Sequence, residues 1–258
     1  MTGDGGALPT RRRWQGAGQI LRYNRPAYLA AALATAALAG GAWLTFLPNW
    51  ARAACLAAAV LVFAAAAASL LVAHAIYDRS PLHRWTWLTA GLPEPGSWLV
   101  LHAGLDEATP ALRRLYPGAA GLSLDIYDAA AMDKPSIRAA RVQEAAESPC
   151  ASHAALPVPD GRTDLLMLFF VAHELRAEDD QGALLQEVHR VLRAGAMPGR
   201  AVVVEHLRDV PNGLAFGPGA LHFFGRRRWL RVFGAAGLAV RQELRITPFV
   251  RAFFLEAT

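Results

Sequence analysis

The stretch DLLMLFFVAHELRAEDDQGALLQEVHRVLRAG at residues 164–195 decides the fold class of this 258-residue chain. It begins with an apolar run, Asp164–Val171, typical of a central parallel strand that is buried on both faces. Apolar residues then recur with helical spacing from Leu184 to Leu192, and Gly195 ends the predicted helix. A buried strand followed at once by an amphipathic helix is the repeating unit of an α/β sheet.

The same alternation continues on both sides of this stretch. Short apolar runs predict further strands at 97–102, 122–125, 201–205, 240–246 and 250–255. Helical patterns lie near 111–115, 137–142 and 226–236. The sequence therefore predicts a doubly wound, mainly parallel α/β sheet of the Rossmann-like kind, and the last two strands, with no long helix between them, predict an antiparallel pair. Ligands of such sheets bind at the carboxyl ends of the strands.

Two long apolar runs precede the predicted sheet, at 27–47 and 53–76. At about 1.5 Å rise per residue, each is long enough to cross the roughly 30 Å hydrocarbon core of a bilayer. A tight turn, Pro48–Arg52, joins them, so the sequence predicts two transmembrane helices in a hairpin. A cleaved signal peptide fits less well, because the first run begins late, is long and is followed directly by the second. A buried helical pair in a soluble protein would normally carry a polar stripe.

This interpretation divides the chain into four parts. They are a basic cytoplasmic tail (1–26), the transmembrane hairpin (27–76), a juxtamembrane linker (77–96) and the α/β domain (97–258). Tryptophans lie near the predicted membrane interfaces, where indole rings favour the headgroup zone: Trp43, Trp50, Trp85 and Trp87. The hairpin would also be the contact in a homo-oligomer, although Gly40-Gly41 is not a small-xxx-small motif.

The positive charge of the chain is confined to its first third. Residues 1–88 hold eight arginines and two aspartates, a net +6, whereas residues 89–258 hold eighteen Lys or Arg and nineteen Asp or Glu, a net −1. A nucleic-acid-binding face would need the excess on the folded domain, so nucleic acid is excluded as a partner. The arginines flank the hairpin and only Arg52 lies in its turn, which places both termini and the α/β domain in the cytoplasm, at the inner membrane of a bacterium. Two cysteines exclude a disulfide scaffold and a zinc finger.

Three motifs carry a resemblance to a known family. They are Leu156-Pro-Val-Pro-Asp160, Thr163-Asp-Leu-Leu166 and Leu185-Gln-Glu-Val-His-Arg-Val-Leu-Arg-Ala-Gly195. With them, residues 97–256 resemble class I S-adenosylmethionine (SAM)-dependent methyltransferases, closest to the quinone C-methyltransferase branch. The resemblance implies SAM as the cofactor, and the residues that follow each strand as its binding site.

The loop after the first predicted strand departs from the family pattern of Asp-x-Gly-x-Gly-x-Gly. His102 stands in place of the acid, and Gly104 alone remains of the glycines that let backbone amides approach the methionine part of SAM. Glu107 or Asp106 is expected to hold the SAM ammonium group in place of the missing acid. Asp125 closes the second strand, where an acid accepts hydrogen bonds from both ribose hydroxyls.

Three further residues are expected beside the nucleoside. Tyr127 would flank the ribose or adenine, and Phe169 would pack against adenine or the methyl acceptor. The family's adenine-contacting acid before Leu156 is missing, so Ala155 or its neighbours are expected to offer backbone amides instead.

Three histidines follow the predicted strands that would border the methyl acceptor: His173, His206 and His222. Histidine titrates near neutral pH, so each is a candidate general base or positioning group, with His206 first because it directly follows a strand. Glu174 and Glu205 beside them leave a divalent metal open, but no local ligand spacing supports one, and none is predicted. The 226–231 arginine cluster is interpreted either as a lipid-binding patch, aided by Phe223 and Phe224, or as an ordinary exposed helix.

The favoured function is thus a membrane-anchored SAM-dependent methyltransferase. Its acceptor would be a hydrophobic, membrane-associated small molecule such as a quinone, a lipid or an isoprenoid-like compound. Two alternatives stay open. In one, the domain is a degenerate module that binds a lipid or a partner protein without turnover of SAM. In the other, it is an enzyme that uses the fold for a different reaction.

Overall fold

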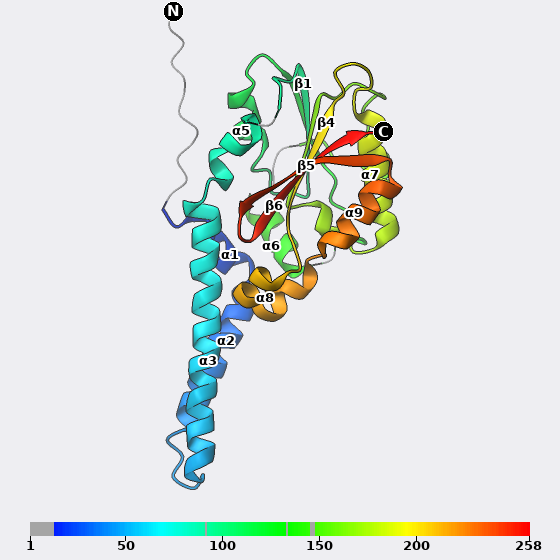
Figure 1. Ribbon diagram of the computed structural model, residues 1–258. Helices are drawn as coiled ribbons and strands as arrows, with labels where there is room; N and C mark the ends of the chain where they lie inside the picture. The colour runs from blue at the N-terminus through cyan, green and yellow to red at the C-terminus, as the bar shows by residue number, and fades with distance from the viewer. Residues whose placement is uncertain (1–12, 91, 133, 145–147) are drawn as a thin grey trace, which may run out of the picture.

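A six-stranded sheet forms the centre of the computed structural model, which describes residues 13–90, 92–132, 134–144 and 148–258 (Figure 1). The strands are β1 (Ser97–His102), β2 (Ala120–Asp125), β3 (Leu165–Phe169), β4 (Arg200–His206), β5 (Leu238–Thr247) and β6 (Val250–Ala257). Their order is β2-β1-β3-β4-β6-β5. β2, β1, β3 and β4 are parallel, whereas β6 runs antiparallel to β4 and β5. The predicted mainly parallel sheet with a closing antiparallel pair is confirmed.

Two hydrophobic clusters cover the two faces of this sheet. On one face, α7 (Glu178–Val191) and α9 (Arg226–Ala235) bury side chains such as Leu184 and Trp229 against β1, β3 and β4. The other face is covered by α5 (Thr109–Leu115) and by residues of the 77–96 segment. The remaining helical segments of the domain are α6 (Pro135–Glu144), η3 (Ala172–Glu174), α8 (Val210–Phe216) and η4 (Gly217–His222).

The segment predicted as a juxtamembrane linker is part of the core. It forms η2 (Leu82–Arg84) and α4 (Thr86–Thr89), and its apolar residues pack on the sheet. Trp85 and Trp87 are only 3% and 8% exposed, so their predicted place at a membrane interface is wrong. An apolar sheet face needs a covering layer, and in this chain the segment after the hairpin supplies it.

Two long helices project from the domain as a hairpin (Figure 1). They are α2 (Arg25–Gly41) and α3 (Asn49–His74), and the Tyr28 hydroxyl lies 3.1 Å from the Ser69 hydroxyl across the pair. Among the described residues, one helical stretch, Asn49–Arg84, is long and apolar enough to cross a membrane, and only 6% of its most apolar window is buried. α2 is shorter, at 17 residues.

The tail in front of the hairpin contains an ordered helix. Residues 1–12 lie outside the described part of the chain, but α1 (Gln15–Tyr23) packs on η1 (Ala75–Arg79), a π-helical turn that continues α3. The Asp78 carboxylate accepts hydrogen bonds from the backbone N–H groups of Gly16 and Ala17, at 2.7 and 3.1 Å. An acid at this end of a helix satisfies free N–H donors and opposes the helix dipole.

A close approach between two strands generates a prediction about stability. Trp98 on β1 pairs with Gly121 on β2, and a Cβ added at Gly121 would overlap the indole ring. We expect Gly121→Ala to lower the free energy of unfolding by about 1–3 kcal/mol, because the buried ring must move to make room. Gly118→Ala is the matched control, since nothing lies within 4 Å of its added Cβ. Thermal denaturation of both variants checks this, and equal melting temperatures would contradict it.

Candidate functional site

His102 ends β1 and folds back onto its own loop. It is 2% exposed, and its Nδ1 accepts a hydrogen bond from the backbone N–H of Gly104 at 3.0 Å. Burial lowers the pKa of His102, so its imidazole is neutral at pH 7. A neutral ring does not replace the charge of the family's acid, but it fixes the conformation of Gly104, whose φ of +105° favours glycine.

The two acids of this loop have structural partners. Asp106 accepts hydrogen bonds from the backbone N–H of Thr109 at 2.9 Å and from the Ser123 hydroxyl at 2.6 Å, so it caps the start of α5 and ties it to β2. Glu107 lies 3.9 Å from the imidazole Nε2 of His83, in the segment that follows the hairpin. The proposed contact of either acid with a SAM ammonium group stays a prediction.

Arg141 of α6 lies where the cofactor residues were predicted to meet. Its guanidinium donates to the Asp125 carboxylate at 2.6 Å and covers the Tyr127 ring at 4.1 Å from the ring centroid. A Cβ added at Gly104 would overlap the Arg141 side chain. The fold thus brings Gly104, Asp125 and Tyr127 together, as the sequence predicted, around an arginine that sequence reasoning missed. No motif in the sequence marks Arg141.

The other two predicted cofactor residues lie apart from Arg141. Ala155 is exposed, and its N–H donates to the carbonyl of Ser152 at 3.2 Å, within its own loop. Phe169 ends β3 on the face covered by the segment after the hairpin, where its ring lies 4.9 Å from that of Trp85. Their contacts with adenine stay predictions.

Two of the motifs that carried the resemblance, 156–160 and 185–195, are bonded to each other. Arg190 pairs with Glu187 at 2.6 Å and donates to the carbonyl of Leu156 at 3.0 Å, while Glu187 accepts from the N–H of Leu156 at 2.7 Å. Arg190 also pairs with Asp160. These bonds hold the 156–160 loop on α7, which gives the spacing of the two motifs a structural cause.

His206 is enclosed between aromatic rings at the end of β4. Phe170 and Phe223 stack on its two faces, each with a centroid distance of 4.9 Å. Its Nδ1 lies 3.0 Å from the carbonyl of Phe249 and must donate there, so Nε2 accepts from the Tyr77 hydroxyl at 2.7 Å. Burial lowers the pKa of His206 to about 3. Because both ring nitrogens are engaged in hydrogen bonds, His206 is poorly suited to act as a general base, although the sequence favours it over His173 and His222.

Phe170 adopts a backbone conformation that is rare for its residue type. It follows β3 directly and has a φ of +54°, in the left-handed region. In this conformation the Phe170 ring stacks on the imidazole of His206. Such strain persists where surrounding contacts fix it, and it is common at functional sites.

His173 belongs to a buried chain of alternating charges. Its Nδ1 lies 2.6 Å from Glu205 and its Nε2 lies 3.0 Å from Glu174, which pairs with Lys134 at 2.7 Å. Burial opposes protonation, but the two carboxylates outweigh it and raise the pKa of His173 to about 9. Burial likewise opposes the charge of Glu174, but His173 and Lys134 lower its pKa to about 2. His173 is therefore an imidazolium at neutral pH and a poor proton acceptor.

His222 differs from the other two histidines. It is half-buried on η4, and its ring centroid lies 5.8 Å from that of His173. Burial and the positive charge of His173 lower its pKa to about 4, so it is neutral at pH 7. Among the three candidates, His222 is thus the neutral imidazole that retains partial exposure. The three rings do form one cluster, together with Phe223.

The predicted lipid patch near α9 is wrong in its aromatic part. Phe223 and Phe224 are 6% and 5% exposed and cannot enter a membrane. Arg226 pairs with Glu243 at 2.7 Å, and Arg231 pairs with Glu178 at 2.8 Å. These pairs favour the alternative interpretation, an exposed helix with ordinary surface arginines.

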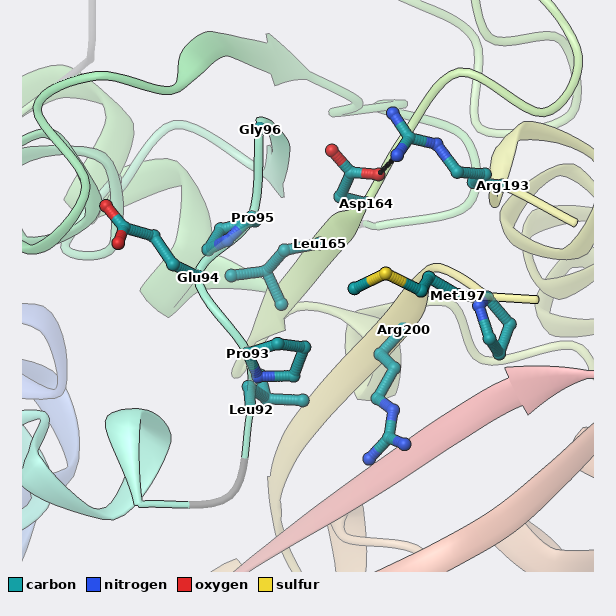
Figure 2. A pocket seen from close by; sticks show the side chains of 11 residues that line it. Leu92, Pro93, Glu94, Pro95, Gly96, Asp164, Leu165, Arg193, Met197 and Arg200 are labelled. Carbon is teal, nitrogen blue, oxygen red and sulfur yellow. Dashed lines mark ion pairs between the residues drawn. The ribbon is translucent and has the colours of Figure 1, made fainter. Parts of the chain in front are cut away.

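A surface hollow lies at the opposite edge of the sheet, where β1, β3 and β4 begin (Figure 2). The 92–96 segment forms one wall, and the ion pair between Asp164 and Arg193, at 2.8 Å, crosses another. Asp164 also accepts from the N–H of Ser97 at 2.8 Å. This hollow is remote from the carboxyl ends of the strands, and we assign it no part in the site. Within the described ranges, no group of three or more His, Cys, Asp or Glu side chains is arranged to hold a metal ion.

Comparison with known proteins supports the fold and the cofactor class. Residues 103–197 match a family described as "Methyltransferase domain". A SAM-dependent methyltransferase from Aquifex aeolicus has 16% identity and a TM-score of 0.52, and the alignment covers 70% of this chain and 94% of that one. The sequences of curated proteins give no match.

Two further structures extend the likeness to the N-terminal helices. The pyocyanin biosynthetic protein PhzM has 15% identity and a TM-score of 0.54, with 95% of this chain and 71% of that one covered. The mitomycin 7-O-methyltransferase MmcR has 14% identity and a TM-score of 0.54, with 96% and 74% covered. At such identities the likeness shows the fold, which is the Rossmann-like fold of class I SAM-dependent methyltransferases.

The charge chain around His173 generates a prediction about pH. The pKa of His173 rises from 6.5 to about 9 on folding, so its contribution to stability is complete below about pH 6.5 and is lost as the pH rises through about 9. We expect the melting temperature to fall across that window. In His173→Gln, it should be lower at pH 6.5 and should change less as the pH rises. Parallel pH dependences in the two proteins would contradict this charge state.

Proposed function

We propose that this chain is a SAM-dependent methyltransferase held on the cytoplasmic face of a membrane by the α2–α3 hairpin. Its acceptor is a hydrophobic small molecule dissolved in that membrane, of the quinone, lipid or isoprenoid kind. One observation carries the proposal: Tyr77, in the turn that continues α3, donates a hydrogen bond to His206 at the end of β4. The apolar hairpin thereby supplies a wall of the site, and a membrane anchor there raises the local concentration of a membrane-dissolved acceptor.

The residues at the cofactor edge fit SAM on one condition. Asp125 would accept the ribose hydroxyls and Gly104 would let the backbone approach the methionine part, but both positions are covered by Arg141. Arg141 must therefore turn away before SAM enters. When bound, SAM supplies an electrophilic methyl group.

The histidine cluster divides the remaining tasks among its members. His173 carries a fixed positive charge, which favours an acceptor that becomes anionic as it loses its proton. Phe170 and Phe223 offer flat apolar surfaces around the neutral ring of His206. His222, neutral and half-buried, is the group we assign to hydrogen bonding with the acceptor and to receiving its proton.

Arg141 also favours a second candidate function, a degenerate domain that binds a lipid or a partner protein without SAM turnover. In that case the pair of Arg141 with Asp125 would be a permanent filling of the former cofactor site. Titration of the full chain with SAM by calorimetry separates the two, because absence of binding at millimolar SAM leaves only the second.

We expect Asp125→Ala and Arg141→Leu to change SAM affinity in opposite directions. Asp125→Ala should weaken it by about 1–3 kcal/mol, because the ribose hydroxyls lose a charged partner. Arg141→Leu should strengthen it by about 1 kcal/mol, roughly fivefold, because nothing then competes for the carboxylate. Arg138→Leu on the same helix is the matched control. Weaker binding by Arg141→Leu would mean that the arginine contacts the cofactor.

For His222 we expect a loss of turnover without loss of SAM binding. His222→Gln should lower the turnover of a quinol or phenol acceptor by roughly 10²-fold or more, the usual contribution of a positioned proton acceptor. Because the pKa of His222 is about 4, turnover in the parent should be constant through neutral pH and fall only as the pH approaches 4. His189→Gln, on α7, is the control. Turnover within threefold of the parent would leave proximity and orientation as the source of catalysis.

A further inference from the structure

Residues 210–221 form α8 and η4 up to the residue before His222, and their surface is uncharged. The run VPNGLAFGPGAL contains no acidic or basic residue. Three of its large apolar side chains point outward, since Val210, Leu214 and Leu221 are 74%, 82% and 67% exposed, while Phe216 is half-buried beside His206. We call this run the 210–221 segment.

The polarity of the segment is reversed with respect to a water-exposed helix. A surface helix normally turns its apolar stripe inward and its polar face outward. Here Ala215 and Ala220 are 7% and 3% exposed, and Asn212 is fully buried with its amide bonded to the carbonyl of Phe249. The small and polar side chains thus face the domain together with Phe216, while the aliphatic side chains of Val210, Leu214 and Leu221 face away from it. Such an arrangement indicates apolar surroundings on the outer side.

The position of the segment identifies those surroundings. α8 packs against α3, and it lies on the side of the domain from which the hairpin projects (Figure 1). Charged side chains lie at its borders: Arg208 and Arg227 are exposed, and Asp209 between Arg208 and the segment accepts a hydrogen bond from the N–H of Asn212 at the start of α8. Arginines that border an apolar surface suit the headgroups of a bilayer with anionic lipids.

We propose that the 210–221 segment lies in the interface of the bilayer that the hairpin crosses, with Leu214 and Leu221 among the upper acyl chains. This inference rests on the proposed function, because it needs the hairpin in a membrane. The same segment supplies Phe216 to the histidine cluster, and His222, which also belongs to the cluster, follows it directly. The membrane-inserted segment is therefore also a wall of the acceptor site, and a lipid-dissolved acceptor enters beside it without crossing water.

Fluorescence quenching in nanodiscs tests this placement. The full chain, with Cys55→Ala and Cys150→Ser, receives a single cysteine by Leu214→Cys, Leu61→Cys or Met197→Cys. Each cysteine is labelled with nitrobenzoxadiazole in discs of phosphatidylcholine and phosphatidylglycerol. The label at Leu61 is the control for a position on the hairpin inside the bilayer. The label at Met197, which is 71% exposed at the opposite edge of the sheet, is the control for a position in water. Calorimetry of SAM binding provides the check on folding.

We expect the label at 214 to be quenched by spin-labelled lipid and protected from iodide, as at 61, while the label at 197 shows the reverse. If 61 is quenched by lipid and 214 behaves like 197, the interfacial placement is overturned and the hairpin stands. Protection from iodide at 214 without quenching by lipid also overturns it, because another protein copy then covers the segment. If 61 is not quenched either, the membrane anchor itself fails, and this inference fails with it.

Discussion

The hydrogen bond from Tyr77 to His206 joins two parts of the chain that are 129 residues apart. The phenol belongs to the turn after α3, and the imidazole ends the strand at the centre of the sheet. His206 is 3% exposed and Tyr77 is half-buried, so loss of the phenol leaves a buried imidazole nitrogen unpaired at a cost of about 1–3 kcal/mol. The carbonyl of Phe249 fixes the tautomer of His206, which makes Tyr77 the donor of this bond, and Phe170 and Phe223 stack on the neutral ring. The turn that continues the helical hairpin is therefore joined directly to the site.

The charges near the acceptor position are arranged so that one histidine determines the state of another. Glu205 is fully buried and keeps His173 protonated, and the positive charge on His173 then opposes protonation of His222. Buried ions of this kind are costly unless each has a close partner. Lys134 and Glu174 complete the series, so that two positive and two negative groups alternate. These four groups have no net charge together, but their fixed positions create a constant electric field around His222.

The sheet could be predicted from the sequence because its strands are continuous apolar runs, and β1 was predicted with its observed bounds, Ser97–His102. The convergence of Gly104, Asp125 and Tyr127 also followed from strand order alone. Neither Arg141 nor Tyr77 could be found in this way, because each enters the site from a helix outside the sheet, through side-chain packing that has no periodic signal. The three histidines do lie in one cluster, but their protonation depends on burial and on partners such as Glu205, which only the three-dimensional structure reveals. Trp85 and Trp87 were misplaced because tryptophan suits a membrane interface and a protein core equally well.

The bonds from Asp78 to the start of α1 have a consequence for the order in which this protein is made. α1 precedes the hairpin in the chain, yet the carboxylate that caps it follows the hairpin. These two bonds can form only after residue 78 has been synthesised, and by then the residues of both α2 and α3 have been made. Gly16, where a side chain would overlap Tyr77, lets α1 approach this turn closely. The contacts that hold α1 on the turn after α3 therefore depend on residues that lie on the far side of the whole hairpin in the sequence.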